Sequence, residues 1–228
     1  MMPPRVKVCC IGSVVEARLA IEHGASALGL VSAMPSGPGV ISEAQIAEIA
    51  SAVPPPVGAF LLTSSTDAPH IAAQARQCRV NTLQLVDAVE PATYTYLRTV
   101  LPATKLVQVI HVESEANVAE AARVAPHVDA LLLDSGRPSA TIPELGGTGR
   151  THDWSLSRRI VEAVDTPVFL AGGLRASNVG EAIRAVRPVG IELCSGVRSD
   201  GALDPVKLGA FFQAVCEAAC GPSGAHTT

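Results

Sequence analysis

The chain has 228 residues, 48% of them hydrophobic, and this length permits a single domain if that domain is an α/β barrel. The formal net charge is −4 without a basic run, which argues against nucleic acid or an anionic membrane surface as a partner. No apolar stretch reaches the ~18 residues of a transmembrane helix, and the opening residues lack the apolar region of a signal peptide, so we expect a cytoplasmic protein.

Apolar runs alternate along the chain with helix-like segments. The runs cover residues 6–12, 27–33, 57–63, 82–88, 105–112, 130–136, 167–173 and 191–197. Among the helix-like segments, those at 42–53 and 114–126 open on Ser42 and Ser114, which we expect to be N-cap residues. Strands that are apolar on both faces are typical of a parallel sheet. The repeated unit predicts a TIM barrel over residues 1–220, with a doubly wound sheet as the alternative and a disordered tail at 221–228.

Small residues follow each of the last three predicted strands. In a TIM barrel the loops after strands 7 and 8 frequently bind phosphate, because glycine lets backbone N–H groups approach an oxyanion closely. We therefore expect a phosphate site in these loops, the alternative being that the glycines only form tight turns. The candidate residues are Gly147, Thr148, Gly149, Gly172, Gly173, Ser195 and Gly196.

Two reactive side chains stand at predicted strand ends, Cys9 on the first strand and Asp134 on the sixth. A thiolate can take a proton from carbon, and a carboxylic acid can give one to a leaving oxygen. Asp134 closes the otherwise apolar run ALLLD, and a buried carboxylate needs a reason, so a functional role is favoured. Taken alone, Cys9 is more typical of a buried structural thiol, and a role as base would require a lowered pKa with Lys7 nearby.

The six cysteines form no paired CxxC motif, so we expect no metal site and a reduced intracellular protein. Cys10 is expected to alternate toward the helical layer and to be structural. His111 at the end of the fifth strand is compatible equally with a place in the pocket and with a purely structural role. Trp154 is expected to pack the start of a helix against the barrel.

Five segments resemble the phosphoribosylanthranilate isomerase family of tryptophan biosynthesis, in the right order from Lys7 to about Phe212. They are KVCCI (7–11), ALLLDS (130–135), LGGTGRTHDW (145–154), FLAGGLRASNV (169–179) and CSGVRSDGALD (194–204). The resemblance implies a TIM barrel and an aldose–ketose isomerase that needs no cofactor. It implies an Amadori rearrangement, in which an N-(5-phosphoribosyl)amine becomes a 1-amino-1-deoxyribulose 5-phosphate. A small phosphorylated sugar is then the expected partner, with the protein a monomer or a homodimer.

The resemblance also implies roles for individual residues. Asp134 would be the general acid that protonates the ribose ring oxygen and opens the ring to a Schiff base. Cys9 would be the base that removes the C2′ proton. The loop residues 147–149, 172–173 and 195–196 would hold the phosphate.

The sequence departs from the family around the expected aglycone. Cys10 stands where the family has glycine, and Gly39 stands where the family has the arginine that holds the anthranilate carboxylate. Val86 and Asp87 replace a histidine and a glycine. Either another cation replaces that arginine, or the substrate lacks this carboxylate. The candidate cations are Arg137, Arg150 and Arg198, each more typical of a solvated surface charge.

Three hypotheses therefore stand at this stage. The first is a phosphoribosylanthranilate isomerase with a rearranged carboxylate site. The second is a related isomerase of a different phosphorylated sugar that lacks the anthranilate carboxylate. The third is a non-catalytic phosphosugar-binding barrel, against which the presence of both Cys9 and Asp134 argues.

Overall fold

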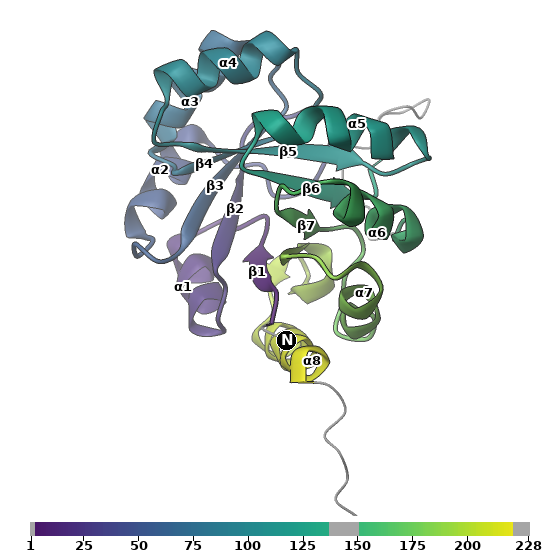
Figure 1. Ribbon diagram of the computed structural model, residues 1–228. Coiled ribbons are helices and arrows are strands. Elements are labelled where there is room, and N and C mark those ends of the chain that lie inside the picture. The colour runs from purple at the N-terminus through teal and green to yellow at the C-terminus, as the bar shows by residue number, and fades with distance from the viewer. Residues whose placement is uncertain (1–2, 137–150, 221–228) are drawn as a thin grey trace, which may run out of the picture.

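The computed structural model describes residues 3–136 and 151–220. Within these residues eight parallel strands form a closed barrel in sequence order, in which the first strand pairs with both the second and the eighth (Figure 1). The strands are β1 (Arg5–Val8), β2 (Ala27–Val31), β3 (Gly58–Thr63), β4 (Thr82–Leu85), β5 (Lys105–His111), β6 (Ala130–Asp134), β7 (Val168–Leu170) and β8 (Gly190–Leu193). The predicted TIM barrel is confirmed, and the doubly wound sheet is excluded because the sheet closes on itself.

Helices surround the strands (Figure 1). They are α1 (Val14–Glu22), α2 (Glu43–Ala52), α3 (Ala68–Cys78), α4 (Pro91–Val100), α5 (Ala116–Val124), α6 (Trp154–Ala163), α7 (Val179–Val186) and α8 (Pro205–Cys220). Two short 3₁₀ helices, η1 (Ala125–His127) and η2 (Ser195–Val197), and an antiparallel pair, β9 (Arg198–Ser199) with β10 (Ala202–Leu203), complete the described elements. None of the helices in the described ranges combines the length and the apolar character needed to span a membrane.

The two expected N-caps have different outcomes. Ser42 caps α2 as predicted, since its hydroxyl accepts from the Gln45 backbone N–H and the Gln45 side chain accepts from the Ser42 backbone in return. The prediction for Ser114 was wrong. Helix α5 begins one residue later than a Ser114 cap requires, and the Asn117 side chain instead accepts from the backbone N–H of Ser114 at 2.9 Å.

The strands are shorter than the apolar runs that predicted them, mostly at their C-terminal ends. Strand β1 ends at Val8 and β8 ends at Leu193, so Cys9, Cys10 and Cys194 lie in the loops that leave the barrel. The apolar character continues past the last ladder hydrogen bond because these residues stay buried or half-buried at the barrel mouth. An apolar run in the sequence therefore predicts which residues are buried, but it does not predict where the strand's hydrogen bonds end.

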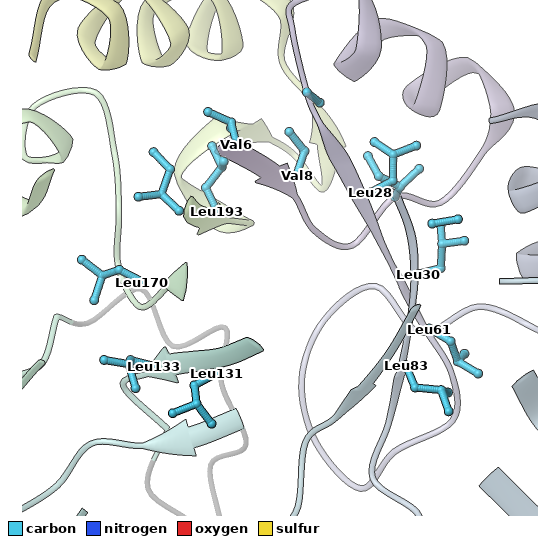
Figure 2. Packing of buried hydrophobic residues seen from close by; sticks show 14 of the residues in the cluster. Val6, Val8, Leu28, Leu30, Leu61, Leu83, Leu131, Leu133, Leu170 and Leu193 are labelled. Atoms are coloured by element: carbon cyan, nitrogen blue, oxygen red, sulfur yellow. The ribbon is translucent and has the colours of Figure 1, made fainter. Parts of the chain in front are cut away.

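Alternation along each strand divides the core into two layers. Figure 2 shows the layer between the barrel and its helices, with leucines and valines pointing outward from successive strands. The second layer fills the barrel interior with smaller or flatter side chains such as Ala27, Phe60 and Leu132. Trp154, the first residue of α6, packs against the outer layer as predicted.

The inner layer also holds a buried ion pair. Lys7 of β1 is fully buried and pairs with Glu192 of β8, which stands opposite it in the strand register. The Lys7 ammonium lies 5.1 Å from the centre of the Phe60 ring. Gly29 of β2 leaves room for this arrangement, since a Cβ there would lie 2.6 Å from the Cys9 Sγ and 3.0 Å from the Lys7 Nζ. The closed barrel thus carries a charged cluster just below its mouth.

Candidate functional site

A pocket opens at the carboxyl ends of the strands and brings together the two predicted reactive groups. Cys9, from the end of β1, and Asp134, from the end of β6, both line it. Glu192 and Cys194 from the end of β8 share the same pocket. The opposite wall is apolar and is formed by Val31, Met34, Leu62, Val86 and Val109. The pocket therefore pairs a wall of titratable groups with a wall suited to a flat apolar substituent.

Burial shifts the pKa of the Asp134 carboxyl toward neutral pH. Its side chain is 9% exposed, and burial raises the pKa of its carboxyl to about 6. The backbone N–H of Ser135 opposes this shift, the negative charge of Glu192 adds to it, and His111 and Lys7 oppose it further. A carboxyl with a pKa near the working pH can both hold a proton and release it, which is the property that general acid catalysis needs.

Glu192 is the neighbour that sequence reasoning missed, and it pairs with Lys7, the residue already expected near Cys9. The Lys7 Nζ lies 3.9 Å from the Cys9 Sγ, so the ammonium faces the thiol directly. Burial acts to lower the pKa of Lys7, but Cys9 and Glu192 outweigh it and leave the pKa raised. The signal for Glu192 was present in the sequence, because a charged residue inside the apolar run GIEL points inward by strand alternation.

The expected phosphate residues fall in two groups. Gly172, Gly173 and Ser195 line a second small pocket that shares Asp134 and Cys194 with the first. Both glycines have left-handed backbones, with φ of 87° and 63°. Gly196 packs against the carbonyl oxygen of Leu174, too closely for any side chain to fit. Gly147, Thr148 and Gly149, like Arg137 and Arg150, lie outside the described residues.

Cys10 does not point toward the helical layer, so that prediction was wrong. It lines the same pocket as Cys9 and belongs to the inner core layer. The reason is its backbone, since a φ of 61° breaks the alternation that holds along β1. This left-handed conformation costs an L-residue roughly 1–2 kcal/mol. A glycine at position 10 would adopt it without that cost.

Gly39 is packed against Cys10. A Cβ on Gly39 would lie 2.5 Å from the Cys10 Cβ and 3.1 Å from its Sγ, and Gly39 itself has a φ of 78°. The Cys10 thiol also contacts the carbonyl oxygen of Pro38 at 3.6 Å. Positions 10 and 39 therefore form one structural unit, in which the side chain and the Cα of Cys10 leave no room for a side chain at 39.

We expect Gly39→Ala to lower the free energy of unfolding by about 1–3 kcal/mol, the usual cost of overpacking. In a Cys10→Gly background the same change should cost less, because the contacts with the Cys10 Cβ and Sγ are gone, while the 2.9 Å contact with the Cα of residue 10 and the unfavourable backbone conformation remain. A double-mutant cycle by urea denaturation measures this coupling. Strictly additive effects at the two positions would contradict the packing described here.

Arg198 does not act as a solvated surface charge. Its guanidinium forms an ion pair with Glu16 at 2.9 Å and donates to the carbonyl oxygens of Cys10 at 2.5 Å and Cys9 at 3.5 Å. Although burial opposes it, Arg198 helps to hold the pKa of Glu16 below its ordinary value. The arginine therefore braces the loop after β1, and its charge is already matched by a carboxylate.

His111 lies outside the pocket that holds Cys9 and Asp134. Its ring is buried, it contacts the carbonyl oxygen of Val86 at 3.2 Å, and it stands opposite Asp134 in the strand register. Within the described part of the chain, neither lysine, arginine nor histidine lines the pocket. Asp87 nearby is half-buried, and burial raises the pKa of its carboxyl.

Comparisons with known proteins identify the family of this chain. The family described as N-(5'-phosphoribosyl)anthranilate (PRA) isomerase matches residues 6–214. The N-(5'-phosphoribosyl)anthranilate isomerase of Haloferax volcanii is 35% identical over 223 residues, covering 97% of this chain and 97% of the relative. The solved structure of phosphoribosyl anthranilate isomerase from Thermus thermophilus is 27% identical with a TM-score of 0.78, covering 93% of this chain and 98% of that one.

A further solved structure shows such an isomerase in complex with reduced 1-(o-carboxyphenylamino)-1-deoxyribulose 5-phosphate. It is 26% identical to this chain with a TM-score of 0.76, and the match covers 93% of this chain and 98% of that one. That relative therefore binds a sugar phosphate carrying an aromatic amine.

Proposed function

Because this chain belongs to the N-(5'-phosphoribosyl)anthranilate isomerase family, we propose that it catalyses the Amadori rearrangement of an N-(5-phosphoribosyl)amine. The observation that carries the proposal is the shared pocket of Asp134 and Cys9, with an acid of raised pKa on one side and a thiol facing a lysine on the other. The substrate is phosphoribosylanthranilate, an intermediate of tryptophan biosynthesis.

The reaction needs one proton given and one proton taken. Asp134 gives its proton to the ribose ring oxygen, the bond from that oxygen to C1′ breaks, and a Schiff base forms between C1′ and the amine nitrogen. Cys9 as thiolate then removes the proton from C2′, and the resulting enolamine tautomerises to the C2′ ketone. The Lys7 ammonium, 3.9 Å from the Cys9 sulfur, would lie beside the negative charge of that thiolate during this step.

The phosphate is proposed to bind at the loops after β7 and β8. Gly172, Gly173 and Ser195 border the pocket that Asp134 also reaches, so a ribose 5-phosphate there would place its sugar ring against the acid. The buried hydroxyl of Ser135 has no partner among the described residues and is directed at the Gly172 loop. The residues Gly147, Thr148 and Gly149 would complete this site, with Gly196 giving a backbone donor.

A second candidate substrate is favoured by the mouth of the pocket. Gly39 has replaced the family arginine, Cys10 occupies the space of a side chain at 39, and Arg198 is committed to Glu16. These contacts favour a ribosylamine phosphate whose aromatic group carries no carboxylate. Losing a charged hydrogen-bonded pair costs about 1.5–3 kcal/mol, equivalent to about ten- to a hundred-fold in affinity.

The test is turnover of freshly made N-(5-phosphoribosyl)anthranilate, followed by the fluorescence of its aromatic amine, beside the matched aniline compound without the carboxylate. We expect both to isomerise. If kcat/KM is about ten- to a hundred-fold higher for the compound that carries the carboxylate, phosphoribosylanthranilate is the substrate. The group that binds its carboxylate then lies outside the pocket lining described above. Equal values favour the second candidate, and no turnover of either by the folded protein would refute the proposed function.

A further inference from the structure

Two thiols that the proposed mechanism does not use meet at the mouth of the pocket. Cys194 follows β8 directly and Cys10 follows Cys9 at the end of β1, and these two strands are neighbours in the barrel. The Cys9 backbone N–H donates to the Leu193 carbonyl at 2.8 Å, which keeps the two loops side by side. The Cys10 and Cys194 thiols line the same pocket, and each shifts the pKa of the other.

The two thiols differ in exposure and in charge. Cys194 is half-buried and borders both pockets, whereas Cys10 is buried. The pKa of Cys194 is lowered, first by the hydrogen bond from Cys10 and, against the effect of burial, by the guanidinium of Arg198. The pKa of Cys10 is raised by its hydrogen bonds to Cys194 and Cys9 and by burial. The more exposed thiol is therefore the one whose pKa is lowered, and its buried neighbour is the one whose pKa is raised.

Cys78 provides a contrast within the same chain. It is the last residue of α3, is fully buried, and contacts the carbonyl oxygen of Glu43 in α2. Burial, with the charge of Glu43, raises the pKa of its thiol to about 11. Cys10 additionally occupies a left-handed backbone position, where a cysteine is strained and a glycine would not be. The pair at the mouth thus differs from an ordinary buried thiol in both charge and backbone conformation.

We propose that Cys194 and Cys10 form a site that reacts with hydroperoxides and closes to an intramolecular disulfide. The Cys194 thiolate attacks one oxygen of the peroxide, the O–O bond breaks, and the other oxygen leaves as an alcohol or as water after taking a proton. This step leaves a sulfenic acid on Cys194. The Cys10 sulfur then attacks the Cys194 sulfur, the S–OH bond breaks, and hydroxide leaves with the Cys10 proton as water. The two thiols lose two electrons, which the peroxide gains.

The disulfide would tie the end of β1 to the end of β8 above the substrate pocket. Cys10 is the chain neighbour of Cys9 and holds Pro38 of the loop after β2. The disulfide would therefore hold the loops after β1 and β8 together at the entrance of the pocket, and we expect reversible loss of turnover. That consequence rests on the proposed function, whereas the disulfide itself does not.

The test is mass spectrometry of the full chain after treatment with hydrogen peroxide and alkylation of the remaining thiols. A Cys216→Ser/Cys220→Ser background removes the two exposed cysteines of α8, which would otherwise link separate molecules. We expect the loss of two free thiols per chain, a linked peptide pair joining Cys10 to Cys194, and full recovery with dithiothreitol. This readout is independent of any isomerase activity.

Matched variants sharpen the result. Cys194→Ser and Cys10→Ser should each abolish the linked peptide, and Cys78→Ser should retain it. If Cys10→Ser does not fold, Cys10→Gly replaces it, since glycine suits the left-handed backbone. A disulfide that involves Cys9, oxidation of Cys194 to a sulfinic acid without a linkage, or an unchanged thiol count would each overturn the proposal.

Discussion

We expect Asp134→Asn to lower kcat/KM for phosphoribosylanthranilate by about 10²–10⁴, the range that a general acid contributes. Asparagine keeps the size of the side chain and can still accept from the Ser135 backbone N–H, but it has no proton to give to the ring oxygen. The loss should appear in kcat more than in KM, because the proton moves only on the way to the transition state. Steady-state kinetics with the fluorescent substrate measures it.

The same substitution should make the folded protein more stable at neutral pH. The unfolded chain releases the Asp134 proton near its ordinary pKa, while the folded chain holds it up to about pH 6. The stability contributed by this group is therefore fully present below the unfolded pKa and is lost as the pH rises through the folded one, by on the order of 3 kcal/mol. Asparagine does not titrate and avoids this loss. A variant that is both inactive and less stable at pH 7 would point to a structural role for Asp134 instead.

A matching pH profile is expected for the wild type. The protonated acid disappears as the pH passes about 6, so kcat/KM should fall on that side. Glu192 contributes to the raised pKa of Asp134, and Glu192→Gln should move this fall to lower pH. If the pH dependence of kcat/KM is the same in Glu192→Gln as in the wild type, the titrating group is not Asp134.

Lys7→Met should be strongly destabilising, costing about 3–5 kcal/mol of unfolding free energy. Methionine fills the space of the lysine stem, but the change leaves the Glu192 carboxylate buried without its partner. The double variant Lys7→Met/Glu192→Leu removes both charges and should recover most of the loss. Urea denaturation of the two variants measures the difference.

Lys105→Met is the matched control, since Lys105 pairs with Asp129 with 65% of its own side chain exposed. Exposed pairs contribute little, so this change should cost no more than about 1 kcal/mol. Equal losses at positions 7 and 105 would contradict the view that burial of Lys7 decides the energetics.

The barrel could be predicted from the sequence because its signal is repeated in every unit. Runs that are apolar on both faces admit few architectures, and the strand-end rule then placed Cys9 and Asp134 at one mouth. What failed were statements that depend on a single backbone angle. Alternation assigned Cys10 to the outer layer, and one positive φ reversed it. The Ser114 cap failed because α5 begins one residue later, at Ala116, which puts Glu115 at the N-cap position.

The pairing of Lys7 with Glu192 was missed for a different reason. The two residues stand 185 positions apart in sequence and become neighbours only when β8 closes against β1. Strand alternation predicts that each of the two side chains points into the barrel, but it does not predict the register of β1 against β8 that makes them neighbours. Likewise the ion pair between Arg198 and Glu16 depends on how the loop after β8 folds back over α1.

The contact between Cys10 and Gly39 also constrains the order in which this pocket can change over evolutionary time. A Cβ at position 39 would meet the side chain of Cys10 and also its Cα, at 2.9 Å, so arginine at 39 requires both a smaller residue at position 10 and a shift of the backbone there. A substitution at 39 therefore cannot be accommodated before position 10 has changed. A mutant library confined to residues 34–42 would miss arginine at 39, and a library meant to recover it must vary position 10 as well.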